Sequence, residues 1–204
     1  MTDDFSTDSQ ERLRDITDDD TRRREILEGN FAQKTETAVS RTIRPATEAD
    51  IPCIMPVFDD AREKMQASGN RKQWTNGYPS VEAVQNDIRR DGGFVIEDDG
   101  KIVGYFAFLP SPEPTYAYIE GGDWLDDSLP YHVIHRIASL PEAHGIFKDM
   151  LAWCSEREAN IRIDTHRDNR IMQHLLSEHG FSYCGIIYLA SGDERLAYQR
   201  IIKA

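Results

Sequence analysis

Residues 169–181 read Asn-Arg-Ile-Met-Gln-His-Leu-Leu-Ser-Glu-His-Gly-Phe, and this segment is the most informative one for predicting the fold. Asn169 is typical of a helix N-cap, because its side-chain oxygen can accept a hydrogen bond from the first helical turn. A helix is therefore predicted from Asn169 to Glu178. Short apolar strands are predicted on both sides of it, at residues 161–165 and 183–189, so that strand, helix and strand follow one another.

Outward from this stretch, the apolar runs and turn residues predict a mixed α/β (α+β) fold. Residues 98–100, Asp-Asp-Gly, are typical of a hairpin turn, and residues 116–120 form an extended patch. Pro52 and Pro56 are expected to kink or divide the first helix. The predicted strands cover residues 42–44, 94–97, 101–109, 131–139, 161–165, 183–189 and 195–201, and the predicted helices about 47–67, 80–90, 145–158 and 169–178.

The composition changes near residue 40. Residues 1–40 are acidic and poor in large apolar side chains, which predicts an N-terminal extension that is disordered or partly helical by itself. Residues 41–204 are expected to form one domain. The three cysteines lie far apart without metal-ligand spacing, which favours free thiols in the cytoplasm.

The charge and hydropathy exclude several classes of protein. The net charge of −12 disfavours binding to nucleic acid or to an anionic membrane and favours a cationic substrate. The chain has no apolar run of 18 residues, which excludes a transmembrane helix. Its first thirty residues also lack the apolar block of a secretory signal.

Three segments resemble motifs of the GNAT (Gcn5-related) N-acetyltransferase family and follow one another in the family's order. The chain therefore resembles a divergent member of that family. Residues 43–47 and 50–51 resemble the family's first strand and turn, residues 103–105 its third strand, and residues 169–181 its most specific motif. The resemblance covers about four fifths of the chain. It implies a GNAT-like acyl-CoA N-acyltransferase fold, with a mixed central sheet in which the parallel strands 131–139 and 161–165 splay apart.

The resemblance implies acetyl-CoA as co-substrate, and the residues themselves supply too few ligands for a metal, so none is expected. Backbone groups left unpaired by the splay would bind its pantetheine amides, and the helix N-terminus near Gly145 would receive its diphosphate. Asn169 would then bind the cofactor, or act only as an N-cap. The cofactor-binding residues implied in this way are Ile137, Ala138, Ser139, Gly145, Ile146, Phe147, Lys148 and Asn169.

The sequence departs from the family pattern at two places. In the diphosphate loop only Gly145 matches, while Glu142 adds a negative charge and Phe147 adds a ring where the backbone should approach closely. Leu176 replaces the tyrosine that in many relatives protonates the departing thiolate. A plain turn without a ligand is therefore an alternative interpretation of the loop.

Amide formation from a protonated amine needs a base. The candidates for catalysis are Glu120, His135 and His166. His135 is either a core histidine or a site residue, and Glu120 is either a partly buried base or an exposed loop acid. His132 and His135 should point to opposite faces of one strand, so they cannot hold one metal together.

The candidates for substrate binding combine aromatic residues in loops with charged residues on strands. Arg136 is expected on the face opposite His135, paired with Asp164 or Glu120. The aromatic residues either wall a pocket or pack in the core. The full set is Trp74, Tyr78, Trp124, Tyr131, Arg136 and Asp164.

Two functions remain open from the sequence. The first is an N-acetyltransferase that acts on the primary amine of a small molecule. The second is a non-catalytic acyl-CoA-binding or ligand-sensing protein with the same fold, which the missing tyrosine and the altered loop favour. A hydrolase that uses Asp164 and His166 would lack a nucleophile on a strained turn. A homodimer is compatible with the sequence.

Overall fold

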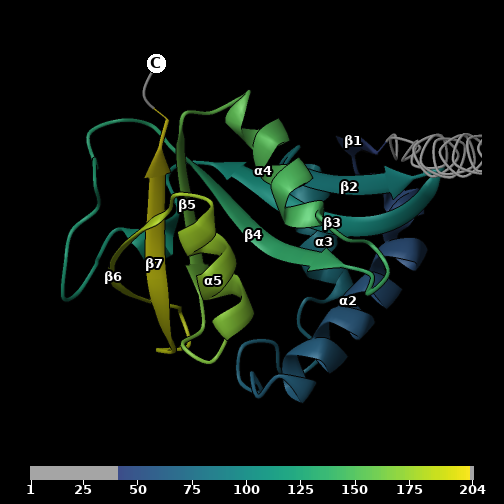
Figure 1. Ribbon diagram of the computed structural model, residues 1–204, viewed down its shortest axis with the longest axis horizontal. Coiled ribbons are helices and arrows are strands. Elements are labelled where there is room, and N and C mark those ends of the chain that lie inside the picture. The colour runs from purple at the N-terminus through teal and green to yellow at the C-terminus, as the bar shows by residue number, and fades with distance from the viewer. Residues whose placement is uncertain (1–40, 203–204) are drawn as a thin grey trace, which may run out of the picture. The chain divides into compact units, whose positions relative to one another are not determined.

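A computed structural model describes residues 41–202, and the expectations for residues 1–40 lie outside this described part. It contains a seven-stranded sheet with helices on both faces (Figure 1). The elements in chain order are β1 (Thr42–Pro45), the short 3-10 helix η1 (Glu48–Asp50), α2 (Ile51–Ala67), α3 (Val81–Arg89), β2 (Gly93–Asp98), β3 (Lys101–Pro110), the 3-10 helix η2 (Pro114–Tyr116), β4 (His132–Ser139), α4 (Ile146–Ser155), β5 (Asn160–Thr165), α5 (Arg170–Glu178), β6 (Ser182–Tyr188) and β7 (Glu194–Ile201). The predicted order of strands and helices is confirmed.

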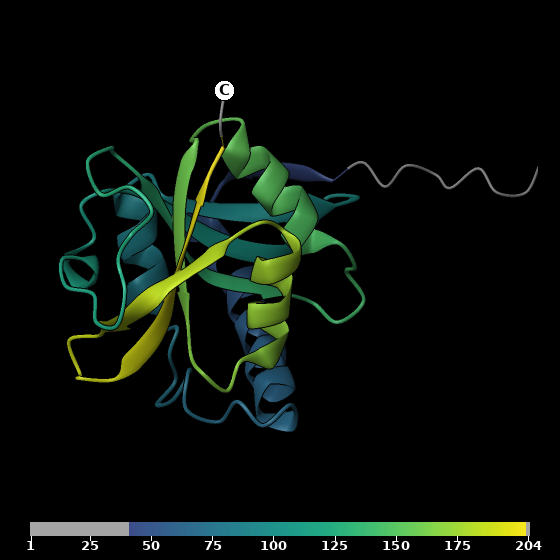
Figure 2. The same cartoon turned by 60° about the vertical axis from the view of Figure 1, so that its left-hand side comes forward.

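The sheet is mixed, with strand order β1-β2-β3-β4-β5-β7-β6. The pairs β1–β2, β2–β3, β3–β4, β5–β7 and β6–β7 are antiparallel, and β4–β5 is parallel. The parallel pair therefore joins an antiparallel N-terminal half to an antiparallel C-terminal half. In Figure 2 the two halves diverge from each other between β4 and β5.

The alternation of side chains along β3 explains why helices cover both faces of the sheet. Tyr105 points to one face, where its ring packs against Phe58 of α2 at a centroid distance of 5.3 Å. Phe106 points to the other face, where it meets Trp153 of α4 at 5.8 Å. Both β3 side chains are fully buried. Because each face of the strand is apolar, the sheet must be covered on both sides.

Local sequence signals fix several of the element ends. The Ser80 side chain accepts a hydrogen bond from the Ala83 amide at the start of α3, and the Asn169 side chain accepts one from the Met172 amide at the start of α5. The β2–β3 hairpin turns through residues 99–100, which have φ angles of 49° and 75°. Positive φ at both central positions is typical of the tight turn that suits twisted strands.

The prediction for residues 116–120 is wrong, and the prediction for the first helix holds only ahead of Pro52. Residues 116–120 do not form an extended patch, since η2 ends at Tyr116 and only Glu120 makes a single bridge, to Ile186. Pro56 does not divide the first helix, because α2 runs without interruption from Ile51 to Ala67. The chain instead separates η1 from α2 ahead of Pro52, which lies in the first turn where its missing amide costs no hydrogen bond.

A bulge interrupts β4 opposite Phe106. Tyr105 pairs with Ala138, but Ala107 pairs with His135, so β4 contains one more residue than β3 over this interval. Arg136 lies in the bulge with a φ of 56°, which is uncommon for a residue with a side chain. The bulge changes the direction of the side chains that follow it.

Candidate functional site

The site begins where β4 and β5 separate. Their only paired residues are His132 with Ile161 and Val133 with Arg162. Beyond Val133, β4 keeps its pairing with β3 but has no strand partner on the β5 side within the described residues. The splay that the resemblance implied is therefore present. It leaves one edge of β4 open to a ligand.

Two cavities adjoin this open edge. The larger has a volume of about 470 Å³ and is lined by β4, β5, the loop before α3 and the β6–β7 turn. The smaller has a volume of about 120 Å³ and is lined by the end of β4, the starts of α4 and α5, and α2. Met65, Ile137, Asn169 and Met172 line both, so the two cavities share a wall.

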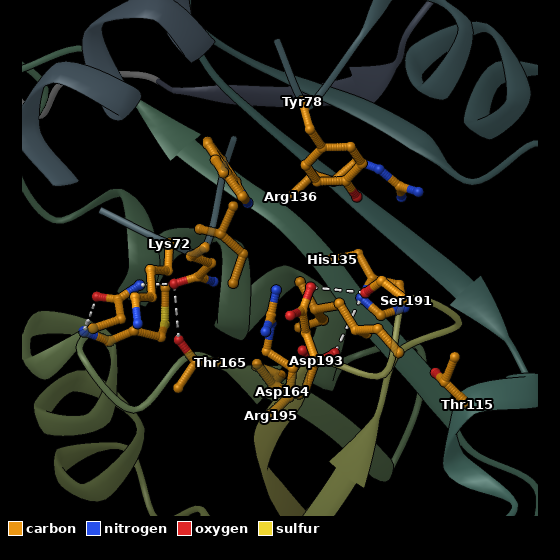
Figure 3. A pocket seen from close by; sticks show the side chains of 18 of the residues that line it. Lys72, Tyr78, Thr115, His135, Arg136, Asp164, Thr165, Ser191, Asp193 and Arg195 are labelled. Atoms are coloured by element: carbon orange, nitrogen blue, oxygen red, sulfur yellow. Dashed lines mark hydrogen bonds and ion pairs between the residues drawn. The ribbon is translucent and has the colours of Figure 1, made fainter. Parts of the chain in front are cut away.

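His135 lies in the larger cavity between two carboxylates (Figure 3). Its Nε2 is 3.5 Å from Glu113 Oε2, and its Nδ1 is 3.6 Å from Asp164 Oδ2. Asp164 also accepts a hydrogen bond of 2.9 Å from the Tyr116 hydroxyl. All three side chains are mostly buried, with exposed fractions of 10% to 21%. Water therefore screens the charges in this cluster only weakly.

The electrostatics of this cluster shift the pKa values of its members. Burial alone would raise the pKa of Glu113, but the hydrogen bond and charge of His135 outweigh it, together with hydrogen bonds from Thr115, and lower the pKa to about 2. Complete burial and the Asp164 carboxylate raise the pKa of the Tyr116 hydroxyl. Glu113 is therefore an anion at neutral pH, and Tyr116 remains a hydrogen-bond donor.

Arg136 has a different partner from the one expected. Its Nη1 is 3.0 Å from Oδ1 of Asp87 on α3, rather than near Asp164 or Glu120. Asp87 is fully buried and also accepts a hydrogen bond of 2.9 Å from the Tyr105 hydroxyl. The expectation that Arg136 and His135 face opposite sides is wrong, since both line the larger cavity. The bulge is the reason, because it breaks the alternation of side chains between them.

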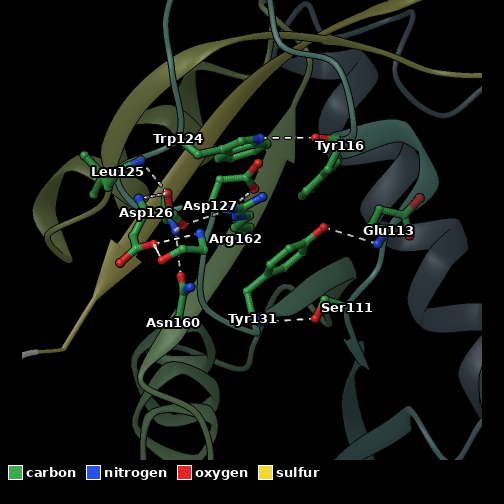
Figure 4. A network of polar contacts seen from close by, with 12 residues as sticks. Ser111, Glu113, Tyr116, Trp124, Leu125, Asp126, Asp127, Tyr131, Asn160 and Arg162 are labelled. Carbon is green, nitrogen blue, oxygen red and sulfur yellow. Dashed lines mark hydrogen bonds and ion pairs between the residues drawn. The ribbon is translucent and has the colours of Figure 1, made fainter.

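The predicted aromatic residues fall into two groups. Trp74 and Tyr78 line the larger cavity. Trp124 and Tyr131 do not line it, because both are buried around the side chain of Arg162 (Figure 4). The Arg162 guanidinium lies 4.0 Å and 3.8 Å from the centroids of these two rings, and its Nη2 is 2.8 Å from Asp127 Oδ1.

Two of the predicted catalytic residues lie outside the lining of both cavities. Glu120 is exposed and accepts a hydrogen bond from the Tyr188 hydroxyl. His166 follows β5, and its Nδ1 accepts a hydrogen bond of 3.1 Å from the Asp168 amide. Burial and the nearby charge of Arg195 lower the pKa of His166. Of the three, only His135 lines the larger cavity.

The smaller cavity gathers most of the predicted cofactor residues. Six of the eight line it, and Gly145 and Lys148 do not. Those six come from the end of β4, the first turn of α4 and the N-cap of α5, which the splay brings together. They are Ile137, Ala138, Ser139, Ile146, Phe147 and Asn169.

The N-terminus of α4 tolerates the unusual loop sequence. Gly145 is its N-cap, with a φ of 77° that favours glycine. The negative charge of Glu142 is paired with Lys101, whose Nζ lies 3.1 Å away. The Phe147 ring is buried and packs against His179 at a centroid distance of 5.1 Å. Neither departure therefore leaves an unpaired acid or an exposed ring at the helix end.

Several charged residues of the site were missed from the sequence. Asp87 lies three residues after the buried Val84 on α3, so the helical spacing places it on the buried face of the helix. An acid on that face could have been identified from the sequence as a candidate site residue. Glu113 lies in a loop and Arg195 on β7, and both line the larger cavity. Neither residue carries a local sequence signal, since only the folded chain brings them into the cavity with His135 and Asp164.

Within residues 41–202, no group of three or more histidine, cysteine, aspartate or glutamate side chains is arranged to hold a metal ion. In the same part of the chain, no helix combines the length and the apolar character needed to cross a membrane.

Comparison with known proteins places this geometry in a family. No family model matches the chain, and no curated protein matches it. Among solved structures, it is similar to a GNAT-family acetyltransferase from Streptococcus agalactiae 2603, with 33% identity, a TM-score of 0.73, and coverage of 80% of this chain and 96% of that chain.

Two more distant structures share the fold alone. A GNAT-family acetyltransferase from Listeria monocytogenes 4b F2365 is 18% identical, with a TM-score of 0.59 and coverage of 79% of this chain and 95% of that one. A ribosomal-protein-alanine N-acetyltransferase from Brucella melitensis is 20% identical, with a TM-score of 0.50 and coverage of 79% and 99%. The streptococcal protein carries the assignment, because its identity extends over nearly its whole length. The chain is an acyltransferase that belongs to the GNAT acetyltransferase family.

Proposed function

We propose that this protein transfers the acetyl group of acetyl-CoA to the primary amine of a small molecule. One observation carries the proposal: the separation of β4 and β5 leaves two cavities that share a wall. The smaller would hold the pantetheine arm and the larger would hold the amine. The larger cavity carries charges of both signs, and the two carboxylates beside His135, Glu113 and Asp164, would favour the ammonium of the acceptor at that point.

The residues around the smaller cavity fit acetyl-CoA. The open edge of β4 offers unpaired backbone groups to the pantetheine amides. Gly145 presents the free amides of the first turn of α4, where an added Cβ would meet no atom nearer than 3.7 Å. Such a helix end favours a diphosphate. When bound, acetyl-CoA supplies the activated acyl carbon.

His135 is the base in this proposal. Its imidazole would take a proton from the ammonium of the acceptor, and Glu113 and Asp164 would stabilise the resulting imidazolium at 3.5 and 3.6 Å. Asp164 would also hold the acceptor ammonium before the proton moves. Glu120 and His166 have no role in this proposal, because neither lines a cavity.

Tyr78 is the acid in this proposal. It is the only tyrosine among the described residues that line the larger cavity. Tyr78 is 39% exposed, but desolvation of its hydroxyl raises the pKa of that group, while the charge of Arg136 opposes the increase. The hydroxyl therefore keeps its proton at neutral pH and can donate it to the departing thiolate. Leu176, at the position of the usual tyrosine, is fully buried and cannot serve.

The test is release of free thiol from acetyl-CoA across a panel of small primary amines, with mass spectrometry of the acetylated products. His135→Ala should lower kcat by roughly 100-fold or more and leave acetyl-CoA binding unchanged. His174→Ala is the matched control, since His174 is 71% exposed on α5. Unchanged turnover in His135→Ala would reject the assigned base.

A second candidate function is a non-catalytic acyl-CoA-binding or ligand-sensing protein. The buried Leu176 favours it, because that position supplies no proton donor. Calorimetric titration with acetyl-CoA and free coenzyme A separates the two candidates. Binding without thiol release from any amine would support the sensor, and turnover would exclude it. We also infer a location in the cytoplasm, which the free cysteines Cys53, Cys154 and Cys184 support.

A further inference from the structure

A buried cation without an acidic partner lies in the wall of the larger cavity. Arg195 of β7 is 6% exposed and lines the cavity beside Asp164 (Figure 3). Its Nη1 donates a hydrogen bond of 2.8 Å to the carbonyl oxygen of Glu194. No carboxylate of residues 41–202 forms an ion pair with it. Two neighbouring acids are engaged elsewhere, Asp193 with Ser191 and Glu194 with Arg167.

Two other arginines near the site, the mostly buried Arg136 and the fully buried Arg162, have acidic partners. Arg136 pairs with Asp87, and Arg162 pairs with Asp127 and is also enclosed by two aromatic rings. A buried guanidinium is costly unless an anion compensates its charge. The positive charge of Arg195 has no such partner, and a bound anion would compensate it.

The register of the sheet places Arg195 next to the carboxylate that faces His135. Asp164 of β5 pairs with Ala197 of β7, and paired residues of an antiparallel ladder point to the same face. Arg195 is two residues from Ala197, so it shares that face and is a diagonal neighbour of Asp164. A negative and a positive group thus stand side by side in the cavity wall.

We propose that Arg195 binds the carboxylate of the acceptor, which makes the acceptor an amino acid or another small aminocarboxylate. This inference rests on the proposed function and narrows its substrate class. The carboxylate would receive paired hydrogen bonds from the planar guanidinium. The amine of the same molecule would point toward Asp164 and His135.

The arrangement of charges in the cavity favours a carboxylate over a phosphate at Arg195. Acidic and basic side chains both line the cavity, namely Glu113, Asp164 and Asp193 and also Lys72, Arg90, Arg136 and Arg195. Because Asp164 lies beside Arg195, it would repel a dianion bound there more strongly than a singly charged carboxylate, which arrives with its own ammonium group. A zwitterionic acceptor matches a wall that carries both signs of charge.

The test compares L-amino acids with the matched amines that lack the carboxylate, at saturating acetyl-CoA and with the full chain. The wild type should prefer the amino acid. Arg195→Met should raise KM for the amino acid by roughly 10- to 100-fold, because charge-assisted hydrogen bonds are lost. KM for the matched amine and for acetyl-CoA should stay within about twofold in the same assay. Arg195→Lys keeps the charge but not the planar guanidinium, so its KM for the amino acid should lie between those of the wild type and Arg195→Met.

Arg157→Met is the matched control, since Arg157 is exposed and lines neither cavity. Three results would overturn the proposal. They are an equal loss for both kinds of amine in Arg195→Met, a raised KM for acetyl-CoA in that variant, or a wild-type preference for an aminoalkyl phosphate. Circular dichroism checks that each variant is folded. If Arg195→Met is not folded, the KM values of Arg195→Lys and the wild-type preference between amino acid and matched amine still test the proposal.

A binding measurement separates failure of this inference from failure of the proposed function. An N-acetyl amino acid and the matched N-acetyl amine are titrated into the wild type and Arg195→Met in the presence of coenzyme A. If no amine is turned over, the transferase proposal fails. Binding that depends on both the carboxylate and Arg195 would still support this site, and equal binding of the two probes would reject it.

Discussion

Glu113 reaches His135 from a loop, and its carboxylate stays ionised because the histidine is so close. The pair is 3.5 Å apart, and only 17% of the Glu113 side chain is exposed. The pKa of Glu113 falls from 4.5 to about 2 on folding, with burial opposing the change and the His135 contact driving it. A depressed acid pKa stabilises the folded chain above pH 4.5, and this stability is lost as the pH falls toward 2.

Glu113→Gln should therefore lower the free energy of unfolding at pH 6 by on the order of 3 kcal/mol. The gap between variant and wild type should shrink as the pH falls from about 4.5 toward 2. Urea unfolding at several pH values measures it. Glu178→Gln is the matched control, because Glu178 contacts His174 in an exposed pair and should change stability by less than about 1 kcal/mol. A gap that is independent of pH would contradict the assignment.

At the scale of elements, the segment between β3 and β4 depends on a stacked arginine. The Arg162 side chain has no exposed surface and lies between the Trp124 and Tyr131 rings (Figure 4). The Tyr131 hydroxyl in turn accepts a hydrogen bond of 3.2 Å from the Glu113 amide. The stack therefore connects β5 to the loop that carries one of the two acids beside His135.

Arg162→Met should lower the free energy of unfolding by about 2 kcal/mol, because desolvated cation–π contacts are lost while side-chain volume is kept. It should also raise KM for the amine and leave KM for acetyl-CoA unchanged. Arg157→Met is the control, because the Arg157 guanidinium stacks on the Trp153 ring at the surface, 3.6 Å from its centroid. This substitution should lower the free energy of unfolding by less than about 1 kcal/mol. Chemical denaturation and steady-state kinetics provide the two measurements. Equal effects of the two substitutions would show that burial of the stack is unimportant.

At the scale of the whole molecule, the order of strands and helices follows from local patterns. The stretch 169–181 could be interpreted from sequence because its cap, helix and turn are encoded within thirteen neighbouring residues. Six of the eight residues assigned from sequence to a cofactor line the smaller cavity for a related reason, since they lie at the ends of β4, α4 and α5. Once the helices and strands are predicted, the residues at their ends can be named directly as candidates for ligand binding.

The larger cavity was less predictable because it depends on contacts between distant segments. The bulge at Arg136 could not be foreseen, since one extra residue in β4 leaves the apolar pattern of the strand unchanged. Trp74 and Trp124 both lie outside helices and strands, yet one lines the larger cavity and the other stacks on Arg162. Sequence reasoning found His135 and Asp164 but not Glu113, which completes their cluster.

The wall shared by the two cavities has a kinetic consequence. Met65, Ile137, Asn169 and Met172 border both spaces, so acyl donor and acceptor can reside in the protein together and meet across this boundary. The rate law should then be that of a sequential, ternary-complex enzyme. Double-reciprocal plots at several fixed amine concentrations should intersect, whereas parallel lines would indicate a ping-pong route through an acylated protein.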